Sequence, residues 1–447
     1  MGRNDVVETP LRQSRFVSFD GAVSSSNPHQ RPDRYRHLEA DFGSRKRIAR
    51  GAGLSYAAAS FGQGSVVQEM SAFDRLLDFD PATRTVRVEA GFTVGCLLDW
   101  AGRQGLYFPV LPGYPLITVG GCIAADVHGK NPLRDGTFSD WVESMTLFHP
   151  AHGFQSIDRT TRPELFEAAC GGFGLTGLIV DATLRLTPLP ATNVSIRHLA
   201  VPSLSASVEE LRGNPDLDFG YSWHDGAARG SGFGRGIVFF GTWTDEPCDN
   251  PPRRYRPMSA ATRGRFPVSL WNRVTARIAN GGFRRLAIRR VTETKSPFDA
   301  AFPFAGQTLY HRFYGRPGLA EVQVLVPDEA VDAFVDELTT LVHRIDPPLV
   351  MMSVKRFMGR QRSLTISGRG SLFALDLARD RATARFLPEF DALVLDVGAQ
   401  PNVAKDSRLP AAIAARALPH HDSFRERLVR LDPDRLYGSE LSQRLEL

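Results

Sequence analysis

The sequence has few cysteines and no long apolar run. Its four cysteines stand singly, without the paired spacing of a zinc site or the density of a disulfide scaffold, and we interpret them as small core residues: Cys96, Cys122, Cys170 and Cys248. No stretch supplies the roughly 18 consecutive apolar residues that a membrane-spanning helix needs. The N-terminus carries acids and lacks an apolar core, so we expect no secretory signal peptide and a cytoplasmic location.

Lysine is also scarce. Only five of the 54 basic residues are lysine, namely Lys46, Lys130, Lys295, Lys355 and Lys405. Because arginine is used almost everywhere else, a remaining lysine suits a role that needs a compact, titratable ammonium group. The alternative explanation is that these lysines were retained by chance. Each lysine is therefore a candidate functional residue.

One segment makes the chain basic. Residues 251–291 hold eleven arginines and no acid, and subtracting them from the net charge of +5 leaves −6 for the rest of the chain. Apolar residues are interleaved there, and they predict a short helix with one apolar and one basic side: Leu270, Trp271, Val274 and Ile278 opposite Arg273 and Arg277. This pattern suits an anionic membrane surface, and a solvated basic loop is the alternative. Nucleic-acid binding is not expected, because no binding module accompanies the arginines.

A chain of 447 residues exceeds what one hydrophobic core serves, so two or three domains are expected, with a boundary near Pro188 and Pro190. The first half predicts a strand over 85–90, a helix capped by Thr93, and a shaped loop over 106–121. Later segments predict strands over 321–326, 350–355 and 371–377, a helix capped by Asp328, and a helix over 382–390, which together indicate an antiparallel sheet. After Lys405 the chain is expected to be helical.

Gly172-Phe-Gly-Leu-Thr-Gly177 matches the dinucleotide pattern GxGxxG, but a Rossmann fingerprint follows a strand and opens a helix. Here a helical pattern from Glu164 precedes the glycines and an alternating strand from Leu178 follows them. We therefore reject a Rossmann fold. His149 and His152 lack a third ligand, so we interpret them as a surface loop and expect no metal site.

Three glycine-rich turns, at 51–56, 113–121 and 171–177, lie in the first 190 residues. Such turns expose successive backbone N–H groups, which can hold a pyrophosphate, and they let a flat ring approach the chain. A dinucleotide such as FAD fits these needs. Glycines that serve the turns alone are the alternative.

Longer motifs strengthen the dinucleotide hypothesis. They are Arg50 to Tyr56, Leu111-Pro-Gly, Thr118-Val-Gly-Gly, Asp126-Val-His-Gly-Lys-Asn131, Gly171 to Gly177, Val354-Lys-Arg-Phe and Ala404-Lys-Asp-Ser-Arg408. With them the chain resembles the vanillyl-alcohol oxidase superfamily, and within it the flavoprotein oxidase subunits of decaprenylphosphoryl-β-D-ribose 2′-epimerase. The likeness spans nearly the whole chain.

The resemblance implies an α+β fold of the two-domain vanillyl-alcohol-oxidase type. Residues 1–190, completed by 400–447, would form the FAD-binding domain, and residues 191–399 would form a substrate-binding domain with an antiparallel sheet. FAD would be noncovalent, since Leu54 stands where relatives with a histidyl-flavin bond carry their histidine.

The resemblance also assigns roles to residues. Flavin contacts fall on Arg50, Gly51, Ala52, Gly53, Leu54, Ser55, Tyr56, Pro112, Gly113, Thr118, Gly120, Gly121, Ala124, Ala125, Val127, His128, Gly174, Thr176, Gly177, Ile179 and Asn402. Catalysis falls on Lys405, His128 and Tyr56, and substrate binding on Lys130, Gln323, Lys355, Trp223 and Lys405. A salt bridge with Asp406 or another acid is the alternative role for Lys405. Four positions depart from the family pattern, namely Phe173, Leu372, Ala374 and Asn402, so the sugar pocket is expected to differ.

By this resemblance the protein would oxidise the 2-hydroxyl of a polyprenyl-phosphate-linked pentose to a ketone, for a short-chain reductase to complete an epimerisation in cell-wall biosynthesis. A lipid-linked substrate and the arginine segment together favour peripheral attachment at the inner face of the membrane. Two alternatives stay open. One is an oxidase of a soluble sugar, alditol or aldonolactone, and the other is a non-catalytic FAD-binding assembly partner at the membrane.

Overall fold

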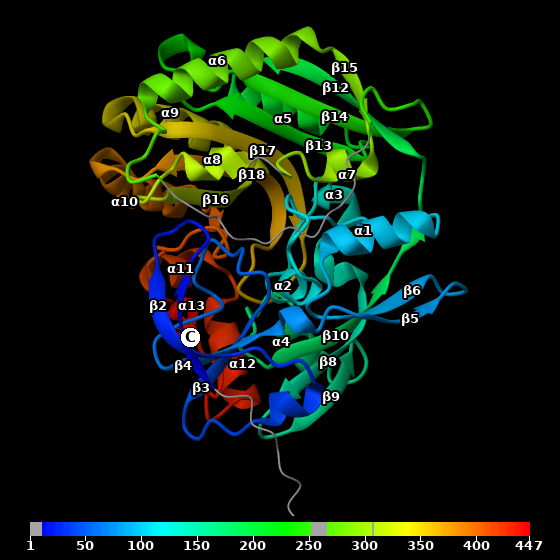
Figure 1. Ribbon diagram of the computed structural model, residues 1–447. Helices are drawn as coiled ribbons and strands as arrows, with labels where there is room; N and C mark the ends of the chain where they lie inside the picture. The colour runs from blue at the N-terminus through cyan, green and yellow to red at the C-terminus, as the bar shows by residue number, and fades with distance from the viewer. Residues whose placement is uncertain (1–10, 252–265, 306–307) are drawn as a thin grey trace, which may run out of the picture.

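The two halves of the chain are built on different sheets (Figure 1). The computed structural model describes residues 11–251, 266–305 and 308–447. The first half holds a four-stranded mixed sheet in the order β1 (Arg12–Val17), β2 (Ser24–Gln30), β4 (Ser65–Glu69), β3 (Lys46–Arg50). It also holds a five-stranded antiparallel sheet in the order β5 (Leu76–Asp80), β6 (Thr85–Glu89), β10 (Leu178–Arg185), β8 (Val142–His149), β9 (Gly153–Asp158).

The second half is one eight-stranded antiparallel sheet. Its order is β15 (Thr292–Lys295), β12 (Asn193–Val201), β14 (Gly236–Thr244), β13 (Phe219–Asp225), β17 (Leu349–Gly359), β18 (Gly368–Ala378), β16 (Leu319–Pro327), β19 (Gln400–Pro401). The short strands β7 (Leu106–Tyr107) and β11 (Thr187–Pro188) pair where the two halves join. The predicted α+β class and the antiparallel sheet are confirmed.

Helices cover both faces of the large sheet (Figure 1). One face packs against α5 (Leu204–Gly213), α9 (Val331–Ile345) and α10 (Arg381–Asp396). The other face carries α6 (Arg273–Arg289), together with the short helices α3 (Pro132–Asp135), α7 (Pro297–Ala301) and α8 (Thr308–Arg312). The cap predicted for Asp328 is wrong. Its carboxylate instead pairs with Arg356 and Arg212, and α9 starts at Val331 without a side-chain cap.

The arginine segment differs from its predicted pattern. Residues 273–289 form a helix longer than expected, and Leu270 and Trp271 precede it. Trp271 is buried, whereas Val274 and Ile278 are exposed, so the four apolar residues do not share one side. Five of the eleven arginines lie outside the described residues: Arg253, Arg254, Arg256, Arg263 and Arg265.

In the first half, Thr93 caps α1 (Val94–Arg103) as predicted, with its hydroxyl accepting from the Cys96 N–H. The loop expected over 106–121 contains β7, and α2 (Val119–Ala124) begins inside it because Thr118 caps the helix. The helix α4 (Pro163–Ala169) precedes the glycines of 171–177 and β10 follows them, so the rejection of a Rossmann fold is confirmed.

Two other interpretations need correction. His149 is buried rather than in a surface loop, because its Nε2 faces the Asp432 carboxylate at 3.4 Å. Cys122 and Cys170 are core residues, but Cys96 and Cys248 are only partly buried. Within the described ranges, no helix is long and apolar enough to cross a membrane, and no cluster of three or more histidine, cysteine or acidic residues could hold a metal.

The end of the chain returns to its beginning. The helices α11 (Ala411–Ala417), α12 (His421–Leu431) and α13 (Glu440–Arg444) lie beside β1 to β4 in Figure 1. The Arg47 N–H donates to the Leu436 carbonyl at 2.8 Å, and the Glu440 N–H donates to the Phe61 carbonyl at 2.8 Å. Phe424, Leu428 and Leu441 are buried in one core with Phe61.

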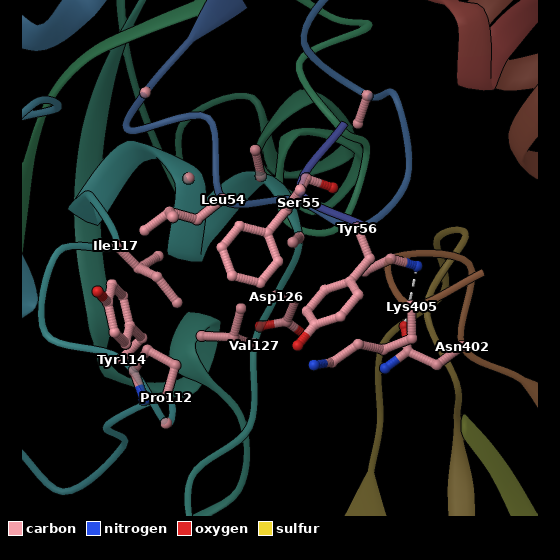
Figure 2. A pocket seen from close by; sticks show the side chains of 18 of the residues that line it. Leu54, Ser55, Tyr56, Pro112, Tyr114, Ile117, Asp126, Val127, Asn402 and Lys405 are labelled. Carbon is pink, nitrogen blue, oxygen red and sulfur yellow. Dashed lines mark hydrogen bonds between the residues drawn. The ribbon is translucent and has the colours of Figure 1, made fainter. Parts of the chain in front are cut away.

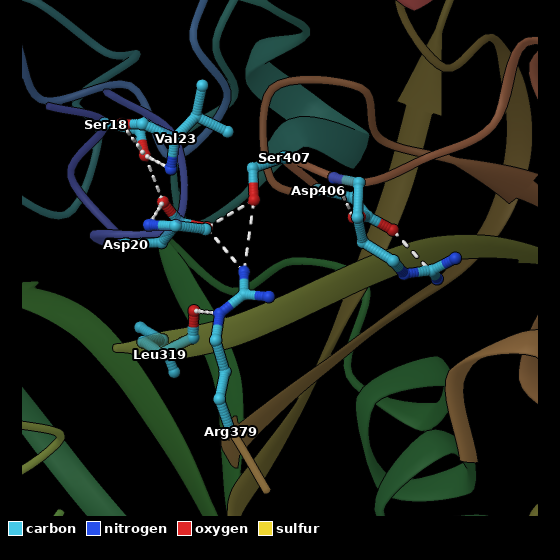
Figure 3. A network of polar contacts seen from close by, with 9 residues as sticks. Ser18, Asp20, Val23, Leu319, Arg379, Asp406 and Ser407 are labelled. Carbon is cyan, nitrogen blue, oxygen red and sulfur yellow. Dashed lines mark hydrogen bonds and ion pairs between the residues drawn. The ribbon is translucent and has the colours of Figure 1, made fainter. Parts of the chain in front are cut away.

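A polar network ties three distant segments together (Figure 3). The buried Asp20 carboxylate accepts from Ser18, Ser407 and Arg379, the last at 2.8 Å. Arg379, which follows β18, also donates its Nε–H to the Leu319 carbonyl at the start of β16. The network therefore fixes the N-terminal segment and the loop after Lys405 to the ends of two strands.

Replacing Arg379 by alanine should lower the free energy of unfolding by about 3 kcal/mol, because it leaves the Asp20 carboxylate buried without its cation. The change is measured by urea denaturation. Arg381→Ala on the exposed side of α10 is the control and should shift stability by less than about 0.5 kcal/mol. Equal effects of the two changes would contradict the role of the network.

Candidate functional site

A cavity lies where the glycine-rich loops of the first half meet β16, β17 and β18 of the large sheet (Figure 2). It encloses about 400 Å³. Its walls come from residues 51–56, 112–128 and 173–179, from the three strands, and from the loop that carries Asn402 and Lys405. The cavity is therefore built from segments that are far apart in the sequence.

The first glycine turn offers free backbone donors. Among the described residues, none accepts a hydrogen bond from the N–H groups of residues 52–56. We call these free N–H groups of residues 52–56 the cradle. Side chains would close it: a Cβ at Gly51 would collide with the Thr118 hydroxyl, and a Cβ at Gly120 would lie 2.8 Å from the Ala90 Cβ. A run of unpaired N–H groups beside bare backbone fits the pyrophosphate of a dinucleotide.

Apolar side chains line the adjoining part of the cavity. Figure 2 shows Leu54, Pro112, Tyr114, Ile117 and Val127 pointing into it. Flat apolar walls suit an aromatic ring system. The residues present therefore fit FAD, with the loops holding phosphates and the apolar walls holding a ring.

The floor of the cavity is polar and comes from alternate residues of the three strands, since every second side chain of a strand faces one side. Glu321 of β16 pairs in register with Asp376 of β18, which pairs in turn with Met351 of β17. Two residues along, Gln323 pairs with Ala374, which pairs with Ser353. All six line the cavity, and Lys355 of β17 continues the row.

Lys405 reaches the cavity from the loop after β19. Its Nζ lies 2.9 Å from the Glu321 carboxylate and 4.2 Å from the centre of the Tyr56 ring. The alternative role predicted for Lys405, a salt bridge with Asp406 or another acid, is therefore met by Glu321, whereas Asp406 pairs with Arg408 at 3.0 Å. Burial and the nearby Glu321 charge raise the pKa of Tyr56 well above its usual value. The ammonium group thus lies between a carboxylate and the aromatic face of a neutral tyrosine.

A second acid lies next to this pair. The Tyr310 hydroxyl donates to the Asp376 carboxylate at 2.5 Å and lies 2.9 Å from the Tyr314 hydroxyl. Burial, and then the charge of Glu321, raise the pKa of Asp376 to about 8. Asp376 therefore keeps its proton at neutral pH.

Basic groups gather farther along this row, at one side of the cavity. Burial and the charge of Lys405 lower the pKa of Lys355 to about 8. Burial and the charge of Lys355 lower the pKa of His128 to about 3, so its imidazole is neutral. The His128 Nδ1 lies 3.2 Å from the Gly129 carbonyl and its Nε2 lies 3.4 Å from Gln323 Oε1. This side favours an anionic or strongly hydrogen-bonding group.

Most of the residues predicted for flavin and substrate contacts line the cavity. Four do not. Arg50 lies behind the first turn and donates to the Ser60 hydroxyl, and Thr176 is buried. Lys130 donates to the Ala301 carbonyl, with its pKa lowered to about 7 by burial and then by Lys355. Trp223 packs its ring against Phe283 of α6, at 4.7 Å between ring centres, so the pocket contact predicted for it is not formed.

Sequence reasoning missed Glu321, Asp376 and Tyr310. The signal for the two acids was available, because each lies two residues along a strand from a residue already considered, Gln323 or Ala374. An acid on an otherwise apolar strand indicates a polar site on the side of the sheet that faces the cavity. No signal of this kind pointed to Tyr310, which reaches the site from α8.

Comparison with known proteins agrees with this geometry. Residues 40–153 match a family model described as an FAD binding domain. The chain is 30% identical over 427 residues to decaprenylphosphoryl-beta-D-ribose oxidase of Mycolicibacterium smegmatis, which covers 91% of each chain. It is also 30% identical over 371 residues to an uncharacterised protein of Streptomyces coelicolor, covering 77% of this chain and 96% of that one. L-galactono-1,4-lactone dehydrogenase 2 of Oryza sativa is 31% identical over 159 residues, or 35% of this chain and 27% of the other.

The fold, the cradle and these matches define an FAD-dependent oxidoreductase that acts on a CH–OH group, with the two-domain architecture of the vanillyl-alcohol oxidase superfamily. Within that class, the chain belongs to the family of decaprenylphosphoryl-β-D-ribose oxidase.

Gly120→Ala should lower the affinity for FAD about tenfold, because the added methyl group meets Ala90 and forces the turn away from the cradle. FAD binding is measured by titrating the deflavinated protein and following flavin fluorescence. Gly102→Ala, where nothing lies within 4 Å of the new Cβ, is the control and should bind FAD normally. Unchanged binding by Gly120→Ala would argue against the cradle.

Asp376→Asn should change how stability depends on pH. The unfolded aspartate releases its proton near pH 4, whereas the folded one keeps it to about pH 8. Between these two values Asp376 is protonated only in the folded state, so its contribution to the free energy of unfolding falls as pH rises, by up to about 1.4 kcal/mol per pH unit. The asparagine variant should lack this decline when urea unfolding is measured from pH 5 to 8. The exposed Asp396→Asn should keep it, and parallel curves for all three proteins would refute the shifted pKa.

Proposed function

We propose that the protein oxidises the 2-hydroxyl group of a pentose linked to a polyprenyl phosphate, giving a ketone. A separate short-chain reductase would then complete an epimerisation that serves cell-wall biosynthesis. The similarity to decaprenylphosphoryl-beta-D-ribose oxidase over 91% of the chain supports the substrate class. The observation that carries the chemistry is Lys405, held between Glu321 and Tyr56 at the polar end of the cavity.

Oxidation of a secondary alcohol removes a hydride from carbon and a proton from oxygen. Bound FAD supplies the acceptor for the hydride, and the chain must orient the alcohol and manage the proton. The Lys405 ammonium can donate to the hydroxyl oxygen and stabilise negative charge there. Glu321, which pairs with Lys405, and the neutral His128 each have a lone pair that could take the hydroxyl proton, whereas Asp376 already carries a proton of its own.

The basic side of the cavity supports a phosphate or sugar oxygen at Lys355. Asn402, whose side chain donates to Gln323 Oε1 at 2.7 Å, and Ala374 shape the space beside it. Phe173 also lines the cavity, in a left-handed backbone conformation with φ of 53°. Leu372 pairs in register with Lys355 and Leu325, on the same face as the row of polar side chains, and is buried in one cluster with Leu325 and Phe357. These four positions depart from the family pattern, and we expect them to set the choice of sugar.

A soluble sugar, alditol or aldonolactone is the second candidate substrate. It is favoured by the pair of acids Glu321 and Asp376, since their oxygens can accept hydrogen bonds from successive hydroxyls and the Glu321 carboxylate disfavours a phosphate placed beside it. The partial match to L-galactono-1,4-lactone dehydrogenase 2 points the same way. The two candidates differ in whether turnover needs the polyprenyl phosphate.

The protein should bleach in the visible range when a polyprenylphosphoryl ribose is added without oxygen, because the alcohol reduces the bound flavin. Lys405→Met should slow this bleaching at least about 100-fold by removing the charge that stabilises the reacting oxygen. Lys295→Met is the control and should bleach normally, because Lys295 pairs with Glu293 on β15. If only polyols bleach the flavin, the protein oxidises a soluble substrate and not a polyprenyl-phosphate-linked pentose. A protein that holds FAD but is bleached by no alcohol would act only as an assembly partner.

A further inference from the structure

The helix α6 exposes apolar side chains to solvent. It rests on the large sheet through Ala276, Asn280 and Ala287. Asn280 anchors it by donating to Asp225 at 2.9 Å and to the Val350 carbonyl at 2.7 Å. The side facing away carries Val274, Ile278 and Leu286, which are 67%, 71% and 68% exposed. A helix that meets only water normally places polar residues on this side.

Arginines are interleaved with these apolar residues, and the helix contains no acid. Arg273 is paired with Asp346, and Arg290, just past the helix, is paired with Glu293. In contrast, Arg277, Arg285 and Arg289 have no acidic partner among the residues that the structure describes. The outer side of α6 therefore combines exposed aliphatic groups with unpaired positive charge. This combination is typical of helices that lie in the interface of an anionic bilayer, where arginine stems extend along the apolar layer and their heads reach the phosphates.

This surface lies on the same face of the large sheet as the cavity. The helix α6 covers β12, β14 and β13, whereas the cavity lies over β17, β18 and β16. In Figure 1, α6 forms the end of the molecule farthest from β3 and α12.

Exposed apolar residues continue from α6 towards the cavity. Val268 and Leu309 are 62% and 55% exposed. Between them and the cavity, the ring of Trp271 lies 5.7 Å from that of Tyr310, which lies 6.1 Å from that of Phe304. Tyr310 and Phe304 both line the cavity. An apolar chain in a bilayer would thus lie next to the wall of the site.

We propose that the outer side of α6, extended by Val268 and Leu309, docks the protein on an anionic phospholipid bilayer with the cavity wall towards the lipid. The charge complementarity between three unpaired arginines and lipid phosphates selects an anionic surface, and the aliphatic residues select a bilayer over a nucleic acid. The further step, that docking delivers a lipid-linked substrate to the cavity, rests on the proposed function.

Binding is tested by sedimenting the FAD-bound protein with vesicles of phosphatidylglycerol and phosphatidylcholine, and with vesicles of phosphatidylcholine alone. The protein should bind the anionic vesicles at least about tenfold more tightly, and the difference should shrink as salt screens the charges. Equal binding to both kinds of vesicle, or no binding to either, would overturn the proposal.

Variants locate the surface. The triple change Arg277→Glu, Arg285→Glu and Arg289→Glu should weaken binding to anionic vesicles at least about tenfold. A charge-matched control, Arg381→Glu, Arg385→Glu and Arg416→Glu on α10 and α11, makes the same change in net charge elsewhere and should weaken binding less than about threefold. Equal weakening by both triples would mean that net charge alone drives binding, which would overturn the assignment to α6.

A second variant tests the apolar part with the charge unchanged. Ile278→Ser with Leu286→Ser should also weaken binding about tenfold, since these side chains are exposed and their loss leaves the fold and the flavin spectrum intact. Unchanged binding would overturn the proposal that α6 enters the bilayer and would indicate a purely electrostatic contact. None of these measurements needs substrate. Vesicle binding without bleaching by a polyprenylphosphoryl ribose would therefore support the docking surface and refute the proposed substrate. Bleaching without vesicle binding would support the substrate and refute the docking surface.

Discussion

The ion pair between Lys405 and Glu321 is the constraint on which the site depends. It places a cation from the C-terminal loop against a carboxylate on the floor of the large sheet, in a region where isolated charge is costly. The neighbouring groups adjust to it by changing their protonation. Asp376 keeps a proton, Tyr56 stays neutral, and the pKa of Lys355 is lowered. These protonation states keep the net charge of the cavity small although it holds many titratable groups. A bound substrate can balance the charge that remains.

The glycine turns and Lys405 line the cavity, as expected from the sequence, because backbone exposure at a turn and a distinctive motif are both local properties. The sequence predicted the helix α9 for the same reason, since a helical period is visible in one stretch of chain. It failed where a residue's surroundings come from elsewhere. Trp223 was placed in the pocket although α6 covers it, and Glu321 and Asp376 become a pair only through the register of two strands.

The two faces of the large sheet have different roles. Against α5, α9 and α10 it builds a continuous apolar core, so that side supplies rigidity. The other face carries the cavity over β16, β17 and β18 and α6 over β12, β13 and β14. Glu321, Gln323, Lys355 and Asp376 thus project from strands whose opposite side is firmly packed, which helps to hold these polar groups in place.

The return of the C-terminal helices to the first strands has a consequence for biosynthesis. Arg47, Phe61 and Ser65 emerge early from the ribosome, but their partners lie between Leu436 and Glu440 and emerge last. Until then the nascent chain carries β1 to β4 with one side uncovered, while the eight-stranded sheet can already form up to β18. The contacts that close the flavin-binding loops thus form only after residues 436–440 have been made, whereas the strands of the large sheet up to β18 precede those residues in the chain.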